Sequence, residues 1–293
     1  MKGQFHKNEA LRRHPCFSEE AHGRWGRLHL PVAPKCNISC NYCDRKFDCV
    51  NESRPGVSSR VLTPSEALER VLVAMERQRI SVVGVAGPGD PLANRATIEF
   101  FSLVKKEIPH TLLCLSTNGL ELPNKVEILR ELGVFSVTVT VNALKVSSAE
   151  KIYSWAFYDG KLMKGREAAE AIIENQWKGL EKIRKAGFHV KVNSVLIPSI
   201  NEGELELIAT KAQKLGVDAM NIIPLIPNGR FREMQRPSCE QLERIRKSCG
   251  KYLPQIRHCK QCRADAFGSL DEDRDMELEM INNALSFDYC EAV

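Results

Sequence analysis

Three cysteines with short, fixed spacing are the clearest chemical feature of the chain. Cys36, Cys40 and Cys43 follow one another as Cys-x3-Cys-x2-Cys, directly after the apolar run 29–34. Three thiolates on one loop can hold three corners of a four-iron cubane, while the fourth iron keeps a position for another ligand. A zinc knuckle is the alternative. Zinc usually takes four ligands from paired Cys or Cys/His units, however, and no second pair lies nearby.

This spacing, with Tyr42 directly before the last cysteine, resembles that of radical S-adenosylmethionine (SAM) enzymes. In that superfamily the open iron chelates the amino and carboxylate groups of SAM, and an electron from the cluster cleaves the sulfonium bond. The resemblance implies a [4Fe-4S] cluster coordinated by the three cysteines and by SAM.

The composition indicates a soluble enzyme of a reducing compartment. The chain has 293 residues, 43% of them hydrophobic, enough for one α/β barrel. Eleven cysteines are too many for a typical cytosolic chain and odd in number, which favours metal ligation over disulfides. The net charge of +5 is dispersed, so nucleic-acid binding is not expected. No signal sequence and no membrane-spanning run are present, so we expect a cytoplasmic protein that does not bind membranes.

Apolar, β-rich runs alternate with segments of helical periodicity, a pattern typical of β/α units around a parallel sheet. We predict strands near 28–33, 81–86, 111–116, 134–141, 188–197 and 217–223. We predict helices near 64–79, 94–107, 123–132, 165–186, 202–215 and 238–250, the first capped by Thr63 before Pro64. Six units predict an α/β fold, a partial (β/α)6 barrel of the TIM type over 28–250, between an N-terminal arm (1–27) and a C-terminal arm (251–293). Segment 145–165 interrupts the fourth unit, either as an aromatic flap over the barrel mouth or as a packed surface loop.

Polar and glycine-containing motifs follow several of the predicted strands. Because the carboxyl ends of parallel strands meet at one edge of a sheet, these motifs should gather beside the cysteine loop. Alone, each motif is only a turn signal. The residues expected to contact the methionine, ribose or adenine parts of SAM are Gly87, Pro88, Gly89, Asp90, Ser116, Asn118, Asn142, Asn193 and Ser194.

Five further cysteines need an explanation, and we interpret them as ligands of auxiliary clusters: Cys16, Cys49, Cys114, Cys259 and Cys262. Cys114 lies in a predicted strand in phase with Ser116, although a buried thiol in a core strand is also common. Cys259 and Cys262 form a ligand-type pair in the C-terminal arm. A zinc site made by this pair and Cys16 is the alternative.

Histidines and one charged run add candidates for ligands and proton transfer. His14, His22 and His29 lie within sixteen residues, close to the presumed cluster loops, and neutral imidazole can ligate iron reversibly. Glu52 follows Cys49 and is a candidate ligand or base. Arg54 is a candidate charge partner for an anionic cluster, and a solvated turn before Pro55 is the alternative for both.

Seven segments, in order along the chain, resemble the motifs of the NifB family, the radical SAM maturases of the nitrogenase cofactor. They are HPCFSEEAH (14–22), APKCNISCNYCDRKFDC (33–49), NESRPG (51–56), GVAGPGDPLAN (84–94), CLSTNG (114–119), KVNSVLIP (191–198) and HCKQCRAD (258–265). Some members carry a further C-terminal domain that resembles small cofactor carriers. The chain ends at Val293 without that domain, so we expect delivery to rest on a separate carrier or scaffold protein.

The resemblance implies carbon insertion at two auxiliary [4Fe-4S] clusters, which are the substrates. One SAM donates its methyl group to a cluster sulfide, and a second is cleaved to a 5′-deoxyadenosyl radical that abstracts hydrogen from that methyl group. Further deprotonation and an extra sulfur from outside give an [8Fe-9S-C] precursor. A reductant protein and cluster donors are implied as partners.

On this chain the resemblance assigns Cys36, Cys40 and Cys43 to the SAM cluster. It assigns to the substrate clusters the ligands Cys16, Cys49, Cys114, Cys259 and Cys262, with His22 and His29 as nitrogen-ligand candidates. The spacing of Cys259 and Cys262 indicates that they share a cluster. We expect Cys49 and Cys114 to share the other, because both emerge at the rim, after the first and third predicted strands.

Two other functions are compatible with the motifs. The first is a radical SAM enzyme that modifies a peptide or activates another enzyme, with auxiliary clusters that only relay electrons. The second is a non-catalytic iron–sulfur scaffold, which would leave SAM intact.

Overall fold

A curved sheet of seven strands forms the centre of the molecule, a computed structural model that describes residues 10–21, 23–49, 58, 60–259 and 261–270. The strand order is β10-β1-β3-β4-β5-β8-β9, and all neighbours are parallel except β10 and β1. The bounds are β1 (Gly26–His29), β3 (Ile80–Val85), β4 (Leu112–Thr117), β5 (Val134–Thr140), β8 (His189–Leu196), β9 (Ala219–Pro224) and β10 (Phe267–Gly268).

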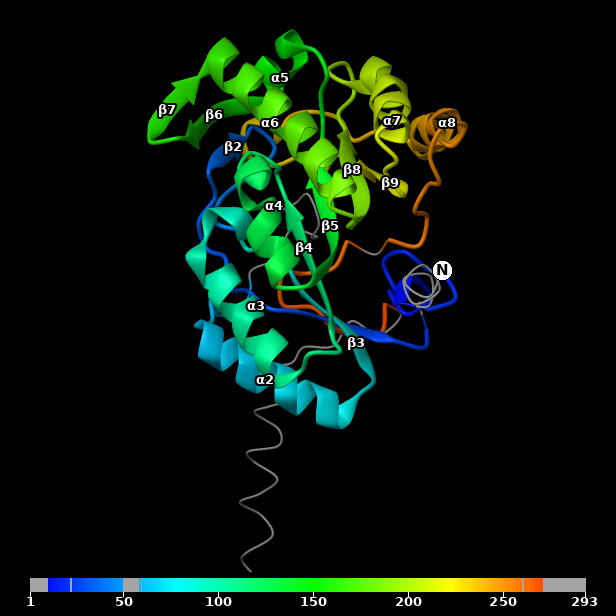
Figure 1. Ribbon diagram of the computed structural model, residues 1–293. Helices are drawn as coiled ribbons and strands as arrows, with labels where there is room; N and C mark the ends of the chain where they lie inside the picture. Colours follow the sequence, from blue (N-terminus) through cyan, green and yellow to red (C-terminus); the bar gives the residue numbers. More distant parts are fainter. Residues whose placement is uncertain (1–9, 22, 50–57, 59, 260, 271–293) are drawn as a thin grey trace, which may run out of the picture.

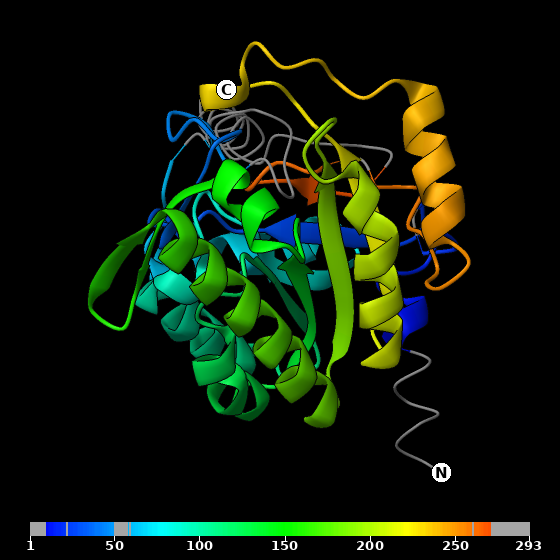
Figure 2. The same ribbon diagram turned by 90° about the horizontal axis from the view of Figure 1, so that it is seen from above.

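Helices follow the parallel strands and lie along the outer face of the sheet (Figures 1 and 2). They are α2 (Pro64–Arg77), α3 (Arg95–Glu107), α4 (Leu122–Glu131), α6 (Gly165–Lys185), α7 (Leu205–Lys214) and α8 (Cys239–Cys249). The six β/α units confirm the predicted partial barrel. Thr63 caps α2 as expected, in a reciprocal capping box with Glu66. Within the described ranges, no helix combines the length and apolar character that a bilayer span requires.

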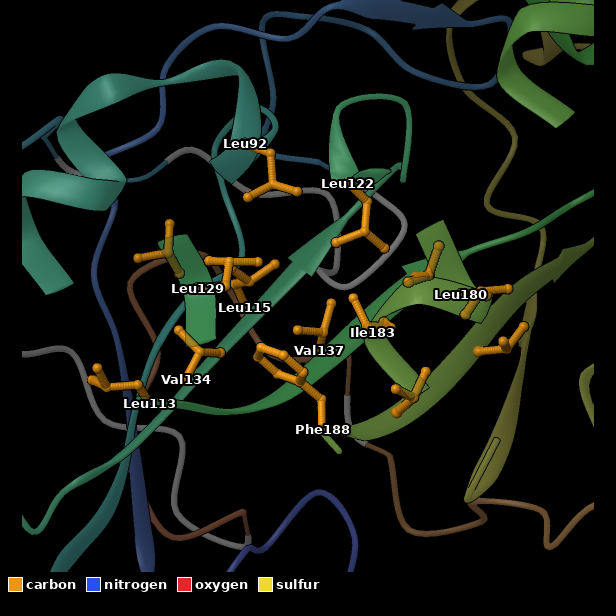
Figure 3. Close-up of a cluster of buried hydrophobic side chains, with 14 of the residues drawn as sticks. Leu92, Leu113, Leu115, Leu122, Leu129, Val134, Val137, Leu180, Ile183 and Phe188 are labelled. Carbon is orange, nitrogen blue, oxygen red and sulfur yellow. The ribbon is translucent and has the colours of Figure 1, made fainter. Parts of the chain in front are cut away.

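Alternating strand residues and one face of each helix build the main core (Figure 3). Leu113 and Leu115 of β4 lie two residues apart and therefore point to the same face of the sheet. Leu129 of α4 and Ile183 of α6 pack against that face, and all four side chains are buried. Truncation of one such side chain to alanine typically costs about 2–5 kcal/mol. This packing fixes the strands whose carboxyl ends carry the polar motifs.

Segment 145–165 is neither of the two structures expected for it. It forms α5 (Val146–Ile152) and the hairpin β6 (Tyr153–Tyr158) and β7 (Lys161–Lys164). Strand β6 also pairs with β2 (Ile38–Cys40), which lies inside the cysteine loop. Asp159 and Gly160 at the hairpin tip have positive φ angles of 50° and 72°. An Asp-Gly pair is a strong signal for such a turn, so the sequence contained the clue.

The C-terminal segment 251–270 reaches both edges of the open sheet. At one edge the Met220 amide donates to the Pro254 carbonyl at 2.9 Å, and Met220 accepts from the Ile256 amide at 2.9 Å. At the other edge β10 pairs antiparallel with β1. Between these anchors the segment crosses the open side of the partial barrel (Figure 2). Cys259 and Cys262 are carried on this crossing.

Asp218 lies between α7 and β9. It connects the start of β9 to the carboxyl end of α6 and to the start of β8. Its carboxylate accepts hydrogen bonds from the Val190 amide at 2.7 Å and from the Arg184 guanidinium at 2.8 Å. Burial alone would raise the pKa of Asp218, but the His189 ring, the Val190 amide and the Arg184 charge together lower it. A carboxyl whose pKa is lowered by folding stabilises the fold above its unfolded pKa, and this contribution is lost as the pH falls.

We predict that Asp218→Asn lowers the unfolding free energy of the metal-free protein by about 1–2 kcal/mol at neutral pH. The difference from the unaltered chain should shrink as the pH falls through and below the ordinary aspartate value of 3.8. Urea unfolding followed by circular dichroism at several pH values measures it. A difference that stays constant down to the acid end would contradict the assigned shift.

Candidate active site

The predicted cysteine triplet lines a pocket at the carboxyl ends of the parallel strands. The pocket spans about 540 Å³, part of it open to solvent, and Cys36, Cys40 and Cys43 all line it. Around them lie residues of the β3, β4 and β5 ends: Ala86, Gly89, Asp90, Ser116, Thr117, Asn118 and Thr140. Four of the residues expected to contact SAM are therefore brought to the triplet.

Cys40 is buried, Cys36 and Cys43 are half-buried, and the three thiols lie close enough for their charges to interact. Burial raises the pKa of Cys40 well above its ordinary value, and the neighbouring Cys43, Cys36 and Cys49 raise it further. Burial and the Asp90 carboxyl raise the pKa of Cys36 to about 11. A bound metal removes this penalty, because it favours thiolates over thiols. The donor set therefore fits a cluster whose iron–sulfur core is cationic.

The same geometry fits a cubane in a second respect. Among the residues that the structure describes, no three His, Cys, Asp or Glu side chains converge as ligands of a single metal ion. In a cubane each cysteine binds its own iron, so three sulfurs need only face a common volume. The triplet pocket supplies that arrangement.

Backbone contacts from distant segments hold the cysteine loop in place. The Asn41 carbonyl accepts hydrogen bonds from the Arg230 amide at 2.7 Å and the Phe231 amide at 3.1 Å, and the Asn41 amide donates to Ile152. Gly229, in the 3-10 turn η3 (Gly229–Phe231), has a φ of 54°. A Cβ there would lie 2.7 Å from the Cys43 carbonyl oxygen. The loop position thus depends on the segment after β9.

Gly89 brings the loop after β3 against the chain that leads into the triplet. A Cβ at Gly89 would overlap the Lys35 carbonyl oxygen and lie 2.8 Å from that of Ala33. The Asp90 amide also donates to the Lys35 carbonyl at 2.9 Å. The close approach that this glycine permits is therefore to the protein's own backbone as well as to the pocket.

Asp90 is a buried junction between two of the loops. Its carboxylate caps the 3-10 turn η1 (Pro91–Ala93) through the Leu92 amide and accepts hydrogen bonds from the Thr117 hydroxyl and the Asn118 amide. Burial raises the pKa of Asp90 to about 6, although these hydrogen bonds oppose the shift. Asp90 fixes the β3 and β4 loops relative to each other.

Asn118 links the β4 loop directly to the triplet. Its side-chain nitrogen donates to Asn37 Oδ1 at 2.7 Å and lies 3.8 Å from Cys36 Sγ. Its side-chain oxygen accepts from the Leu120 amide at 2.9 Å. Both ends of the amide are therefore oriented by the fold.

The other residues expected to contact SAM do not line the pocket that holds the cysteine triplet. Asn142 is fully buried, donates to the Tyr42 hydroxyl at 2.7 Å and accepts from the Val195 amide. Ser194 donates to the Val141 carbonyl, and Asn193 is buried beside it. The space at the Gly87 Cα faces Ala264 of the C-terminal segment, and the Pro88 carbonyl accepts from Arg45.

A second pocket of about 320 Å³ adjoins the first and shares Ala86 and Ser116 with it. Three predicted auxiliary ligands, Cys16, His29 and Cys114, line this pocket. Gly84 lies between two of them, since a Cβ there would be 2.6 Å from Cys114 Sγ and 3.2 Å from His29 Cδ2. The buried Lys191 and the hydroxyls of Ser136 and Thr138 complete one side of the pocket.

The orientation of His29 is set by a carbonyl group. Its Nδ1 lies 3.2 Å from the Arg263 carbonyl oxygen, which can only accept a hydrogen bond. Nδ1 therefore carries the proton, and Nε2 is the nitrogen suited to metal coordination. This is the usual arrangement of a ligating histidine, whose other nitrogen donates to a carbonyl or carboxylate.

His14, named from the sequence only as a member of the histidine cluster, lies beside Cys16 in the second pocket. Its Nδ1 accepts from the Cys16 amide at 3.2 Å, so its Nε2 donates to the Ser136 hydroxyl at 3.1 Å. Burial, with contributions from Lys191 and His29, lowers the pKa of His14 to about 3. His14 is neutral, and its two nitrogens orient the turn that carries Cys16. Its sequence signals were the clustering with His22 and His29 and its position two residues before a cysteine.

The remaining cysteines do not divide as the sequence suggested. Cys114 lies with Cys16 and His29, whereas Cys49 lines the triplet pocket, so the expected pairing of Cys49 with Cys114 is not what the structure presents. Cys114 alternates with Leu113 and Leu115 along β4, so its side chain points to the opposite, inner face of the sheet.

The loop that carries Cys49 faces the C-terminal segment. Burial raises the pKa of the adjacent Asp48, hydrogen bonds from Ser58 oppose the shift, and the charges of Asp265 and Arg263 also act on it. Cys262 is buried on that segment and accepts two hydrogen bonds from Arg27, and Cys259 is half-buried. His22, Glu52 and Arg54 lie outside the described residues.

We predict that Gly89→Ala displaces the cysteine loop, because the added methyl group would meet two backbone carbonyls that cannot rotate away. The variant should lose most of its SAM-dependent change in the paramagnetic resonance spectrum of the reduced protein. Gly203→Ala is the matched control, since a Cβ there has no neighbour within 4 Å. Equal spectra for the two variants would contradict the prediction.

Comparisons with known proteins agree with this geometry. A model of the "Radical SAM superfamily" matches residues 30–212. The chain is 47% identical over 276 residues to "FeMo cofactor biosynthesis protein NifB" of Klebsiella pneumoniae. The aligned region covers 92% of this chain and 59% of the relative. It is 46% identical over 267 residues to the protein of the same name from Methanocaldococcus infernus, covering 89% of this chain and 87% of that one.

Solved structures show the same fold at low sequence identity. Methylornithine synthase matches with a TM-score of 0.54 at 13% identity, over 96% of this chain and 86% of that one. A radical SAM methyltransferase from Sphaerobacter thermophilus matches with a TM-score of 0.50 at 19% identity, over 79% and 64%. The chain spans about three-fifths of the first curated relative and nearly all of the archaeal one. The cysteine triplet, the partial barrel and these matches show that the chain belongs to the NifB family of the radical SAM superfamily.

Proposed function

We propose that the chain is a radical SAM enzyme of FeMo cofactor biosynthesis. It fuses two [4Fe-4S] clusters and inserts a carbide derived from SAM, with an extra sulfur, to give an [8Fe-9S-C] precursor. The observation that carries the proposal is the adjacency of the two pockets, which share Ala86 and Ser116. A radical formed in the triplet pocket would be generated beside a second set of iron ligands.

In this proposal Cys36, Cys40 and Cys43 hold the cluster that binds SAM. When bound, that cluster supplies the electron and the open iron for SAM cleavage. The chain's own residues orient the ligand and exclude water. Gly89, Asp90, Ser116 and Asn118 line the pocket and would contact SAM.

The remaining residues predicted to contact SAM lie behind the residues that line the pocket. Asn142 positions Tyr42 within the cysteine loop through the 2.7 Å hydrogen bond. Gly87 and Pro88 shape the loop that Gly89 anchors. Asn193 and Ser194 brace the β5 and β8 ends, so that the pocket keeps its form when SAM exchanges.

The second pocket would hold one substrate cluster through Cys16, His29 and Cys114. Three ligands for four irons leave the cluster incompletely fixed, which suits cargo that must react and depart. A neutral imidazole carries no charge and can leave iron and return more readily than a thiolate. His29 is therefore proposed to release its iron during fusion and to accept a proton from the inserted carbon.

The other substrate cluster would be held by Cys49, Cys259 and Cys262. Electrostatic contact between Asp48 and the Asp265–Arg263 pair supports the nearness of the two ligand segments. We extend the proposal to His22 as a further nitrogen ligand, Glu52 as a base or ligand, and Arg54 as a charge partner, on the family resemblance alone. We also propose that the chain divides into an N-terminal arm (1–27), a partial barrel (28–250) and a C-terminal arm (251–293).

The proposed reaction requires partners that exchange clusters and electrons. Iron–sulfur cluster donors would load both substrate positions, a reductant protein would supply electrons, and a carrier or scaffold protein would remove the product. We propose a cytoplasmic location, because thiolate ligands and reduced clusters persist in a reducing compartment.

We predict that Cys40→Ala abolishes reductive cleavage of SAM, since the cluster loses one of its three protein ligands. Much of the remaining iron should stay bound, because the other ligand sets are unchanged. Chromatographic detection of 5′-deoxyadenosine under dithionite, with Cys239→Ala as the exposed-thiol control, measures the effect. Cleavage at an unaltered rate would rule out the assignment of the triplet.

We predict that two paired replacements each remove about four irons from an anaerobic preparation that holds about twelve. Cys16→Ala with Cys114→Ala should empty the second pocket, and Cys259→Ala with Cys262→Ala the other position. Methyl transfer from labelled SAM to acid-labile cluster material should fail in the variant that lacks the cluster receiving the methyl group. SAM cleavage without any methyl transfer in the intact chain would instead indicate clusters that only relay electrons.

A further inference from the structure

Arg27 is a buried cation whose three side-chain nitrogens each donate to the C-terminal segment. The side chain leaves strand β1 and is 1% exposed. Nε and Nη2 lie 3.3 Å and 3.2 Å from Cys262 Sγ. Nη1 donates to the carbonyls of Gly268 at 2.8 Å and Ser269 at 3.0 Å. One guanidinium thus holds both a candidate iron ligand and the strand end that follows it.

The geometry of this contact favours a sulfur that carries negative charge. Burial of a guanidinium is costly unless its donors are satisfied by good acceptors. A neutral thiol is a weak acceptor, whereas a charged acceptor strengthens such hydrogen bonds about twofold. The planar fork of arginine presents two parallel donors to one acceptor, which a lysine ammonium cannot reproduce.

We propose that Arg27 is a positioning residue that orients the Cys262 sulfur and tunes the cluster bound there. The proposal rests on the proposed function only in that Cys262 binds an iron–sulfur cluster. Hydrogen bonds to cluster sulfurs help to set the reduction potential, because they stabilise the more negative, reduced state. Arg27 therefore raises the potential of this cluster.

The same two hydrogen bonds withdraw charge from the sulfur and weaken its bond to iron. When that bond breaks, both bonding electrons stay on sulfur, where the guanidinium neutralises the charge. The vacated iron position is taken by a sulfide of the other cluster, or by a donor atom of a chelator in a test, and no oxidation state changes. Arg27 would thus make Cys262 the ligand that lets its cluster go.

The test compares Arg27→Lys and Arg27→Gln in the full chain with Cys16, Cys40 and Cys114 replaced by alanine, so that the Cys262 cluster is observed alone. Redox titration followed by electron paramagnetic resonance gives its midpoint potential. Iron transfer to bathophenanthroline under anaerobic conditions gives its release rate. We expect a more negative potential and a several-fold slower release in Arg27→Gln, with Arg27→Lys intermediate.

If Arg27 only braced the structure, its replacement would make iron release faster, not slower. Faster iron release in both variants with an unchanged potential would overturn the inference. Arg184→Gln is the control, because Arg184 is also partly buried and paired, but at Asp218. It should change neither quantity. If circular dichroism shows that Arg27→Gln does not fold, the result for Arg27→Lys decides between the two explanations. That variant keeps the positive charge but lacks the two parallel donors of arginine. A background protein that binds no iron with Arg27 intact would reject the assignment of Cys262 itself.

Discussion

The structure depends on one electrostatic constraint, which is that three mutually repelling thiolates must share a buried volume. Burial and neighbouring sulfurs raise the pKa of Cys40 well above its usual range, so the loop cannot ionise favourably without a cation. The cysteine loop is held in place by backbone contacts, because the charges of its side chains do not hold it. The Asn41 amide is held by Ile152 at the end of α5, its carbonyl by Arg230 and Phe231 after β9, and the Lys35 carbonyl by the loop after β3. The cysteine loop is preorganised by neutral peptide groups, and the cluster supplies the charge balance.

The second pocket uses a different means of keeping its ligands in place. His14 stays neutral and orients Cys16, while the Arg263 carbonyl fixes the tautomer of His29. Neither contact adds charge to the pocket, and the buried Lys191 adds one positive charge to its wall. A pocket of this kind can accept an anionic cluster without a large rearrangement. On the proposed function, ligand exchange would require only that the neutral His29 nitrogen leaves its iron.

Much of the fold could be predicted because its signals are local. Strand and helix periodicity predicted the six β/α units, and Thr63 with Glu66 predicted the start of α2. The cysteine triplet and the residues Gly89, Asp90, Ser116 and Asn118 were predicted from motifs that follow strand ends. The hairpin at Asp159 was missed although its turn signal is local, because the aromatic run around it suggested a flap.

Contacts between segments far apart in the sequence could not be predicted. Arg27 and Cys262 are 235 residues apart, and neither residue type signals the other. The separation of Cys49 from Cys114 likewise follows from the curvature of the sheet and the path of the loop, which no spacing rule contains.

The crossing of the open barrel by residues 251–270 has a consequence for biosynthesis. His29 receives its orienting carbonyl from Arg263, and β1 receives its last neighbour from Phe267, so ligands near the N-terminus are completed by nearly the last part of the described chain to leave the ribosome. Domains generally fold as the chain emerges, and contacts of long sequence separation form late. On the proposed function, the second pocket could take up its cluster only after residues 251–270 have emerged, so a nascent chain stalled before them would present the triplet loop without a completed second pocket.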